Sequence, residues 1–404
     1  MILRLTSKRK IMTLAFCTRI IMLFVIILLA EKLPAYGFIK NSPDYDDFRY
    51  EEGAVIYAEY ARSIIDIPTF TRIFDSMGDW TGHHLSHPLT EGFLWYWIVC
   101  ILTYFTKWRW WIRILNIVLS VFVTKYIYEL STTLFSEKVG KTASLFYAVF
   151  PYTVIFSCFS YKDTLVSFCT FYIVNFFSQL RNGGKNNLKK IIKLIIVCLI
   201  FIFVRSGISE ILIGFSLLYY YFKPGERLSV KKLIGIFVLI IVGFVMMFLT
   251  IDLVIYKFNA YIGNSSTAGL SGAAWVKITG LCDIWKLPMT FVFSILQPIE
   301  LTGEIESWLS IVSNFNILMC PIAISAFLCV LFRKSQDKYL SLLLIVFYLI
   351  CCVSSVTVFR QLYSIWPIPV IYGINYLIIS KLDRKIMVYA GSIILAAMII
   401  VFFC

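Results

Sequence analysis

Long apolar runs dominate the chain. The clearest cover residues 20–30, 191–204, 233–251 and 386–403, where isoleucine, leucine, valine and phenylalanine follow one another with few polar interruptions. About 20 apolar residues span a bilayer as a helix, and shorter runs suffice where flanking side chains reach the headgroups. The pattern therefore predicts an all-α polytopic membrane protein.

The complete set of apolar runs predicts about eleven transmembrane helices. A basic tail precedes the first run and no convincing small-residue cleavage site follows it, so we expect an uncleaved first helix. We expect the helices at residues 20–36, 113–131, 143–159, 164–179, 191–204, 208–222, 233–254, 309–332, 339–356, 363–380 and 386–404.

Short basic connectors set the predicted orientation, because lysine and arginine collect in cytoplasmic loops. With the N-terminus also in the cytoplasm, two large segments face outward, at 37–112 and 255–308, within a single integral membrane domain of residues 1–404. The connectors are residues 134–141, 181–190, 223–232, 333–338 and 381–385.

Residues 89–106 are also apolar enough to cross a membrane. If they did, every later loop would change sides, which the five basic connectors oppose. The tryptophans around this stretch suit the headgroup layer. We therefore predict a re-entrant or juxtamembrane helix at 89–112 on the outer side. Lys107, Arg109 and Arg113 favour a cytoplasmic end, so a spanning helix stays an alternative.

Composition supports a membrane protein and excludes several other classes. Hydrophobic residues make up 60% of the chain and charged residues 15%, against roughly half and a quarter in soluble domains. The net charge of +14 follows the cytoplasmic connectors, so we expect no nucleic-acid partner. The 11 cysteines lie mostly in apolar runs without a CxxC pair, which argues against disulfides and a cysteine-bound metal.

Carboxylates concentrate in the first external segment. Beside apolar surface they are candidates for general-base chemistry, although a solvated acidic loop explains them equally well. The second external segment ends with Glu304 and Trp308, a carboxylate and an aromatic ring that suit contact with a sugar. The first segment holds 10 of the chain's 23 acidic residues: Asp44, Asp46, Asp47, Glu51, Glu52, Glu59, Asp66, Asp75, Asp79 and Glu91.

All three histidines, His83, His84 and His87, lie in the same segment. His83 and His87 would face each other on a helix, but Pro88 disfavours helix at the residue before it. We therefore favour an anion contact by His87 over a zinc site, with ordinary loop histidines as a third interpretation.

Cations at the outer helix ends are candidates for phosphate binding. Lys162 and Asp163 form a short turn between two apolar helices, and Arg205 and Arg360 end others. Because arginine concentrates in cytoplasmic loops, an arginine at an outer helix end suggests a specific role. Bidentate binding of a phosphate is one such role. Lipid headgroups and a simple interfacial ion pair at the turn are the alternatives.

Several short motifs lie between residues 40 and 180: DDFRY (46–50), GDW (78–80), HPL (87–89), the helix at 113–135 and the segment 150–165. Together they resemble the GT-C class of polyprenyl-phosphate-dependent glycosyltransferases, with weaker similarity at 297–308 and 359–377. The likeness is greatest to the aminoarabinose transferase and protein O-mannosyltransferase group, and implies a GT-C-like helical bundle.

The resemblance implies roles for individual residues. Asp46, beside Asp47, would be the base that deprotonates or orients an acceptor hydroxyl, and Asp163 the second acid. Additional residues separate DDFRY from GDW, which leaves Asp44, Glu51 and Glu52 as alternative acids. No metal is required, although some members of the class use a divalent cation. The donor phosphate would be bound by His87, Lys162, Arg205 and Arg360.

The resemblance thus implies an inverting glycosyltransferase, with an external active site, in a bacterial cytoplasmic membrane. It would use a polyprenyl-phosphate sugar, and the acceptor would be a lipid, a glycan or a protein. A polysaccharide repeat-unit polymerase is a second enzyme reading. A lipid or polysaccharide transporter is a third, less favoured because no internal repeat is visible.

Overall fold

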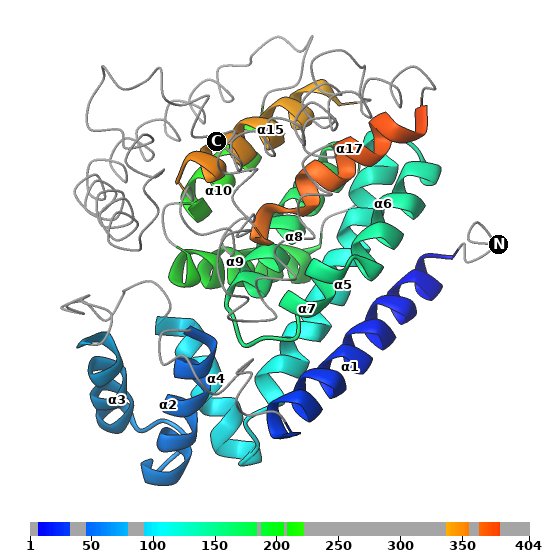
Figure 1. Cartoon of the computed structure of the whole chain (residues 1–404). Helices are drawn as coiled ribbons and strands as arrows, with labels where there is room; N and C mark the ends of the chain where they lie inside the picture. Colours follow the sequence, from blue (N-terminus) through cyan, green and yellow to red (C-terminus); the bar gives the residue numbers. More distant parts are fainter. Residues whose placement is uncertain are drawn as a thin grey trace, which may run out of the picture.

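A computed structural model describes residues 7–32, 46–79, 93–183, 187–205, 208–221, 337–354 and 363–379. Within these ranges the regular structure is helical throughout, without a strand, which confirms the all-α prediction (Figure 1). The elements are α1 (Lys8–Lys32), α2 (Asp46–Tyr60), α3 (Ile67–Asp79), α4 (Phe93–Thr106), α5 (Trp111–Leu134), α6 (Glu137–Val149), α7 (Pro151–Phe156), α8 (Asp163–Arg181), α9 (Leu188–Val204), α10 (Ile208–Tyr221), α15 (Lys338–Ser354), the 3-10 helix η6 (Tyr363–Ile365) and α17 (Pro367–Ile379).

Two of the described helices are long and apolar enough to cross a bilayer. They are Lys8–Leu28, within α1, and Trp111–Leu134, which is α5. The structure therefore supports membrane association. The predicted helices at 233–254, 309–332 and 386–404, and the predicted loop at 255–308, lie outside the described residues.

Helix α5 lies at the centre of the bundle and packs against α1, α6 and α8. Its contact with α6 depends on Gly140. A Cβ atom at that position would meet the Thr132 hydroxyl and lie 2.8 Å from the Tyr128 carbonyl oxygen. In Figure 1, α2, α3 and α4 gather at one end of the molecule, whereas α10, α15 and α17 lie toward the other.

The apolar run predicted as one helix at 143–159 forms two helices. Helix α6 already begins at Glu137 and ends at Val149, and α7 starts at Pro151. A proline has no N–H to continue the ladder and disfavours helical backbone in the residue before it. Likewise the first helix begins at Lys8, well before the predicted residue 20.

The carbonyl groups exposed by this break receive side-chain donors from α1 and α7. Arg19 donates hydrogen bonds to the carbonyls of Tyr147 and Ala148, and each carbonyl also accepts one from a threonine hydroxyl. The bonds are Arg19 Nη1 to Ala148 at 3.0 Å, Arg19 Nη2 to Tyr147 at 3.3 Å, Thr18 to Ala148 at 3.1 Å and Thr153 to Tyr147 at 2.6 Å. Arg19 is fully buried and also donates to the Ser120 hydroxyl. Its partners among the described residues are neutral.

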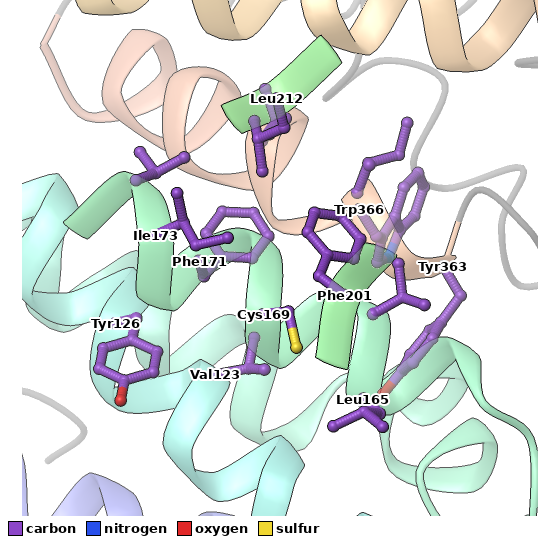
Figure 2. Packing of buried hydrophobic residues seen from close by; sticks show 14 of the residues in the cluster. Val123, Tyr126, Leu165, Cys169, Phe171, Ile173, Phe201, Leu212, Tyr363 and Trp366 are labelled. Atoms are coloured by element: carbon purple, nitrogen blue, oxygen red, sulfur yellow. The ribbon is translucent and has the colours of Figure 1, made fainter. Parts of the chain in front are cut away.

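The apolar core joins helices from distant parts of the chain. Figure 2 shows side chains of α8, α9 and α10 packed with Tyr363 and Trp366. These two residues lie beside α8 although they are far from it in the sequence, since α8 ends at Arg181. Phe171 and Phe201 are fully buried there. This packing holds the start of α8, and with it Asp163, inside the bundle.

The helix ends remote from α2, α3 and α4 carry their own ion pairs. Glu129 on α5 pairs with Lys8 and accepts a hydrogen bond from Asn175 at 2.8 Å, which joins α1, α5 and α8. Arg181 lies 4.0 Å from Asp337 and so joins α8 to the start of α15.

Candidate functional site

The centre of the candidate site is the turn at residues 157–162, which we call the α7–α8 turn. Its residues from 157 to 161 are buried, so its backbone carbonyls need protein donors. Three side chains of α4 and α5 supply them: Trp95 Nε1 to Ser160 at 2.9 Å, Asn116 Nδ2 to Phe159 at 2.6 Å and to Tyr161 at 2.9 Å, and Arg113 Nη1 to Cys158 at 3.2 Å.

Arg113 also connects this turn to α2. Its Nε lies 2.6 Å from Oε1 of Glu51 on α2, and both side chains are completely buried. Arg109 Nη2 lies 3.6 Å from the other carboxylate oxygen of Glu51. One guanidinium therefore bonds simultaneously to α2 and to the turn that leads into α8.

Asp163 is the first residue of α8 and is 2% exposed. A carboxylate at a helix N-terminus is stabilised by the helix dipole. Arg205, which ends α9, places Nη1 at 4.0 Å from Oδ1 of Asp163, and its side chain is 8% exposed. The predicted phosphate ligand Arg205 and the predicted second acid thus form a buried ion pair.

The remaining predicted residues fall into two groups. Asp46 and Asp47 lie in the first turn of α2, Glu52 is exposed on the same helix, and Lys162 is half-buried immediately before α8. The others lie outside the described residues: Asp44, His83, His84, His87, Glu304, Trp308 and Arg360. Within the described part of the chain, no three His, Cys, Asp or Glu side chains gather where they could hold a metal ion.

The prediction did not assign Arg113 or Asn116 to the site. A signal was present, because two polar residues three positions apart share one face of an otherwise apolar helix. Ionisable and polar groups in such helices usually have a defined partner. What the sequence did not reveal was the partner of each group.

Helices α2 and α3 form a hairpin fixed by Asp66. Its carboxylate accepts hydrogen bonds from the backbone N–H groups of Arg62 at 2.9 Å and Thr69 at 3.1 Å, and from the Thr69 hydroxyl at 3.0 Å. These bonds, that of Arg62 first, lower the pKa of Asp66. The Tyr57 hydroxyl accepts from the Asp66 N–H at 2.9 Å. These bonds fix the start of α3 relative to the end of α2.

Comparison with known proteins gives no further guide to the site: no family model, no curated protein and no solved structure matches the chain. The function is therefore inferred from the chain's own geometry. Its main feature is that α2, the α7–α8 turn and α8 are joined through Glu51 and Arg113.

Proposed function

We propose that the protein is a polytopic membrane glycosyltransferase. It would transfer a sugar, with inversion, from a polyprenyl-phosphate donor to an acceptor on the outer face of a bacterial cytoplasmic membrane. The observation that carries the proposal is the link from Glu51 through Arg113 to the Cys158 carbonyl. It supports a site in which the acidic start of α2 and Asp163, far apart in the sequence, share one end of the bundle.

The geometry of α4 supports an external, juxtamembrane position for this end. The helix has 14 residues and is about 21 Å long, shorter than the hydrocarbon core of about 30 Å. Trp95, near the start of α4, and Arg113, in the first turn of α5, both bond to the α7–α8 turn. The start of α4 and the start of the next helix thus reach the same turn, as expected if α4 does not cross the membrane.

The proposed reaction needs a base, a second acid and cations. The acceptor hydroxyl attacks the anomeric carbon, its proton passes to a carboxylate, and the bond to the lipid phosphate breaks. Glu51 is occupied by Arg113, which favours Asp46 or Asp47 as the base over Glu51. The proposed second acid, Asp163, lies 4.0 Å from Arg205. Lys162 and further outer cations would stabilise the departing phosphate without an obligatory metal.

Carboxamide substitutions test this proposal directly. Asp46→Asn, Asp47→Asn and Asp163→Asn are assayed in reconstituted vesicles by mass spectrometry of the glycosylated product. We expect Asp163→Asn and at least one of the other two to lose about 100-fold or more of the transfer rate at unchanged abundance. Glu59→Gln, an exposed site on α2, is the matched control. Wild-type transfer by all three variants would refute the proposal.

A transporter is the second candidate, because the break between α6 and α7 is similar to the interrupted helices of secondary transporters. In those proteins the free carbonyls bind an ion. Here Arg19, Thr18 and Thr153 already donate to them, so the break offers less to a transported ion. Surface glycans of a deletion strain separate the candidates, since loss of one sugar decoration supports a transferase. Accumulated single repeat units would instead support a polymerase.

A further inference from the structure

The structure describes several cations near α2 and the α7–α8 turn, and three of them each face a carboxylate or donate to a backbone carbonyl. Arg113 faces Glu51 at 2.6 Å, and Arg205 faces Asp163 at 4.0 Å. Lys107 donates to the Ala58 carbonyl at 2.6 Å and lies 4.3 Å from the ring of Tyr104. Arg109 also lies near a carboxylate, but none of its guanidinium nitrogens makes a hydrogen bond within the described residues.

The hydrogen-bonding capacity of Arg109 is largely unused by the described residues. Its Nη2 is 3.6 Å from Glu51 Oε2, beyond hydrogen-bond distance, and its Nε is buried without an acceptor. The side chain is 32% exposed, so a ligand can reach the guanidinium. Since Glu51 is already neutralised by Arg113, the three side chains together carry a net charge of +1.

The surroundings of Arg109 indicate the depth at which it lies. Trp108 and Trp111 flank it in sequence, are 42% and 40% exposed, and pack edge to face with ring centroids 5.6 Å apart. Exposed indole rings prefer the headgroup layer of a membrane. The guanidinium also lies 5.0 Å from the ring of Trp110. Arg109 is thus placed at the level where lipid phosphates are found.

We propose that Arg109 is a binding residue for the phosphate of a membrane-embedded lipid. This assignment rests on the proposed function, in which the donor and the released carrier are lipid phosphates. Arginine suits the role, because it keeps its charge and donates several hydrogen bonds to one phosphate. Beside it the N-terminus of α5 has no side-chain cap, so the start of this helix adds to the field that favours an anion.

The test measures binding of fluorescent farnesyl phosphate to the full chain in phosphatidylcholine nanodiscs. We expect Arg109→Gln to weaken binding about tenfold or more, and Arg109→Lys to weaken it less, because lysine keeps the charge but loses the planar fork. Arg72→Gln, which removes an exposed arginine from α3, is the matched control and should bind as wild type does.

The competitors identify the source of the phosphate. Displacement by unlabelled farnesyl phosphate, but not by farnesol, supports a polyprenyl carrier. Displacement by phosphatidylglycerol in the nanodisc supports a phospholipid headgroup at the same residue. Equal binding by Arg109→Gln and wild type, or equal losses in Arg109→Gln and Arg72→Gln, would overturn the assignment. Failure of the transferase proposal appears separately, as wild-type transfer by all three variants Asp46→Asn, Asp47→Asn and Asp163→Asn.

Discussion

Replacement of Arg113 by methionine tests how α2 is held against α5 and the α7–α8 turn. Arg113 Nε and Glu51 Oε1 are 2.6 Å apart, and neither side chain is exposed. Removal of one partner from a buried ion pair costs about 3–5 kcal/mol, because the remaining charge loses its compensation. Arg109, 3.6 Å from the second oxygen, compensates part of the charge on Glu51. We therefore expect a loss near the lower bound, about 3 kcal/mol.

The reverse substitution, Glu51→Gln, should cost less, about 1–3 kcal/mol, because the amide oxygen still accepts from Arg113. The double variant leaves no buried carboxylate without a partner. Its loss should therefore be smaller than the sum of the single losses, by about 1–3 kcal/mol. Equilibrium unfolding in mixed micelles, followed by circular dichroism and tryptophan fluorescence, measures all three variants. Losses that add to within about 0.5 kcal/mol would refute the direct ion pair.

Three further predictions concern packing, a buried charge and pH. Arg19→Met should cost at most about 1.5 kcal/mol in the same unfolding assay. Threonine hydroxyls still donate to the carbonyls of Ala148 and Tyr147, and a buried charge is removed. A loss as large as that of Arg113→Met would contradict this expectation. Gly140→Ala should cost about 1–3 kcal/mol of unfolding free energy. A second substitution, Thr132→Ala, should not restore stability, because the Tyr128 carbonyl oxygen remains 2.8 Å from the new Cβ atom. Full restoration would show that only the Thr132 side chain obstructs the new methyl group. Because the pKa of Asp66 is lowered in the folded protein, its ionised carboxylate stabilises the fold at pH values above 3.8, the ordinary pKa. This stabilisation is lost as the pH falls through the lower pKa of the folded state. Thermal unfolding at pH 6 and pH 3 should therefore show a gap between wild type and Asp66→Asn that narrows in acid, and a constant gap would contradict the sign.

The helix pattern was largely predictable from the sequence, because apolar runs and helices have nearly the same bounds. The run at 164–179 corresponds to α8 at Asp163–Arg181, and the run at 191–204 to α9 at Leu188–Val204. The break at Pro151 was hidden, because apolar residues continue on both sides of it. Polar and basic residues before residue 20 concealed the true start of α1, which Glu129 stabilises by pairing with Lys8.

The site was less predictable than the fold. The side of the membrane expected for each loop suggested that the first-loop acids and Asp163 share one end of the bundle. The pairing of Glu51 with Arg113 joins residues 62 positions apart, and no local pattern encodes such a contact. Arg205 was predicted to bind phosphate, which stays a prediction; its ion pair with Asp163 was not predicted. Long-range partners depend on how helices pack, which hydropathy alone does not specify.

The side of the membrane on which two positions lie is the most direct test of the whole account. In a variant whose 11 native cysteines are replaced, single cysteines are introduced by Glu52→Cys on α2, Lys162→Cys in the α7–α8 turn and Lys138→Cys on α6. Intact cells are treated with a membrane-impermeant maleimide. The account predicts labelling at positions 52 and 162 from outside, and at position 138 only after permeabilisation. Labelling of position 162 only from the cytoplasm, with position 52 outside, would contradict it.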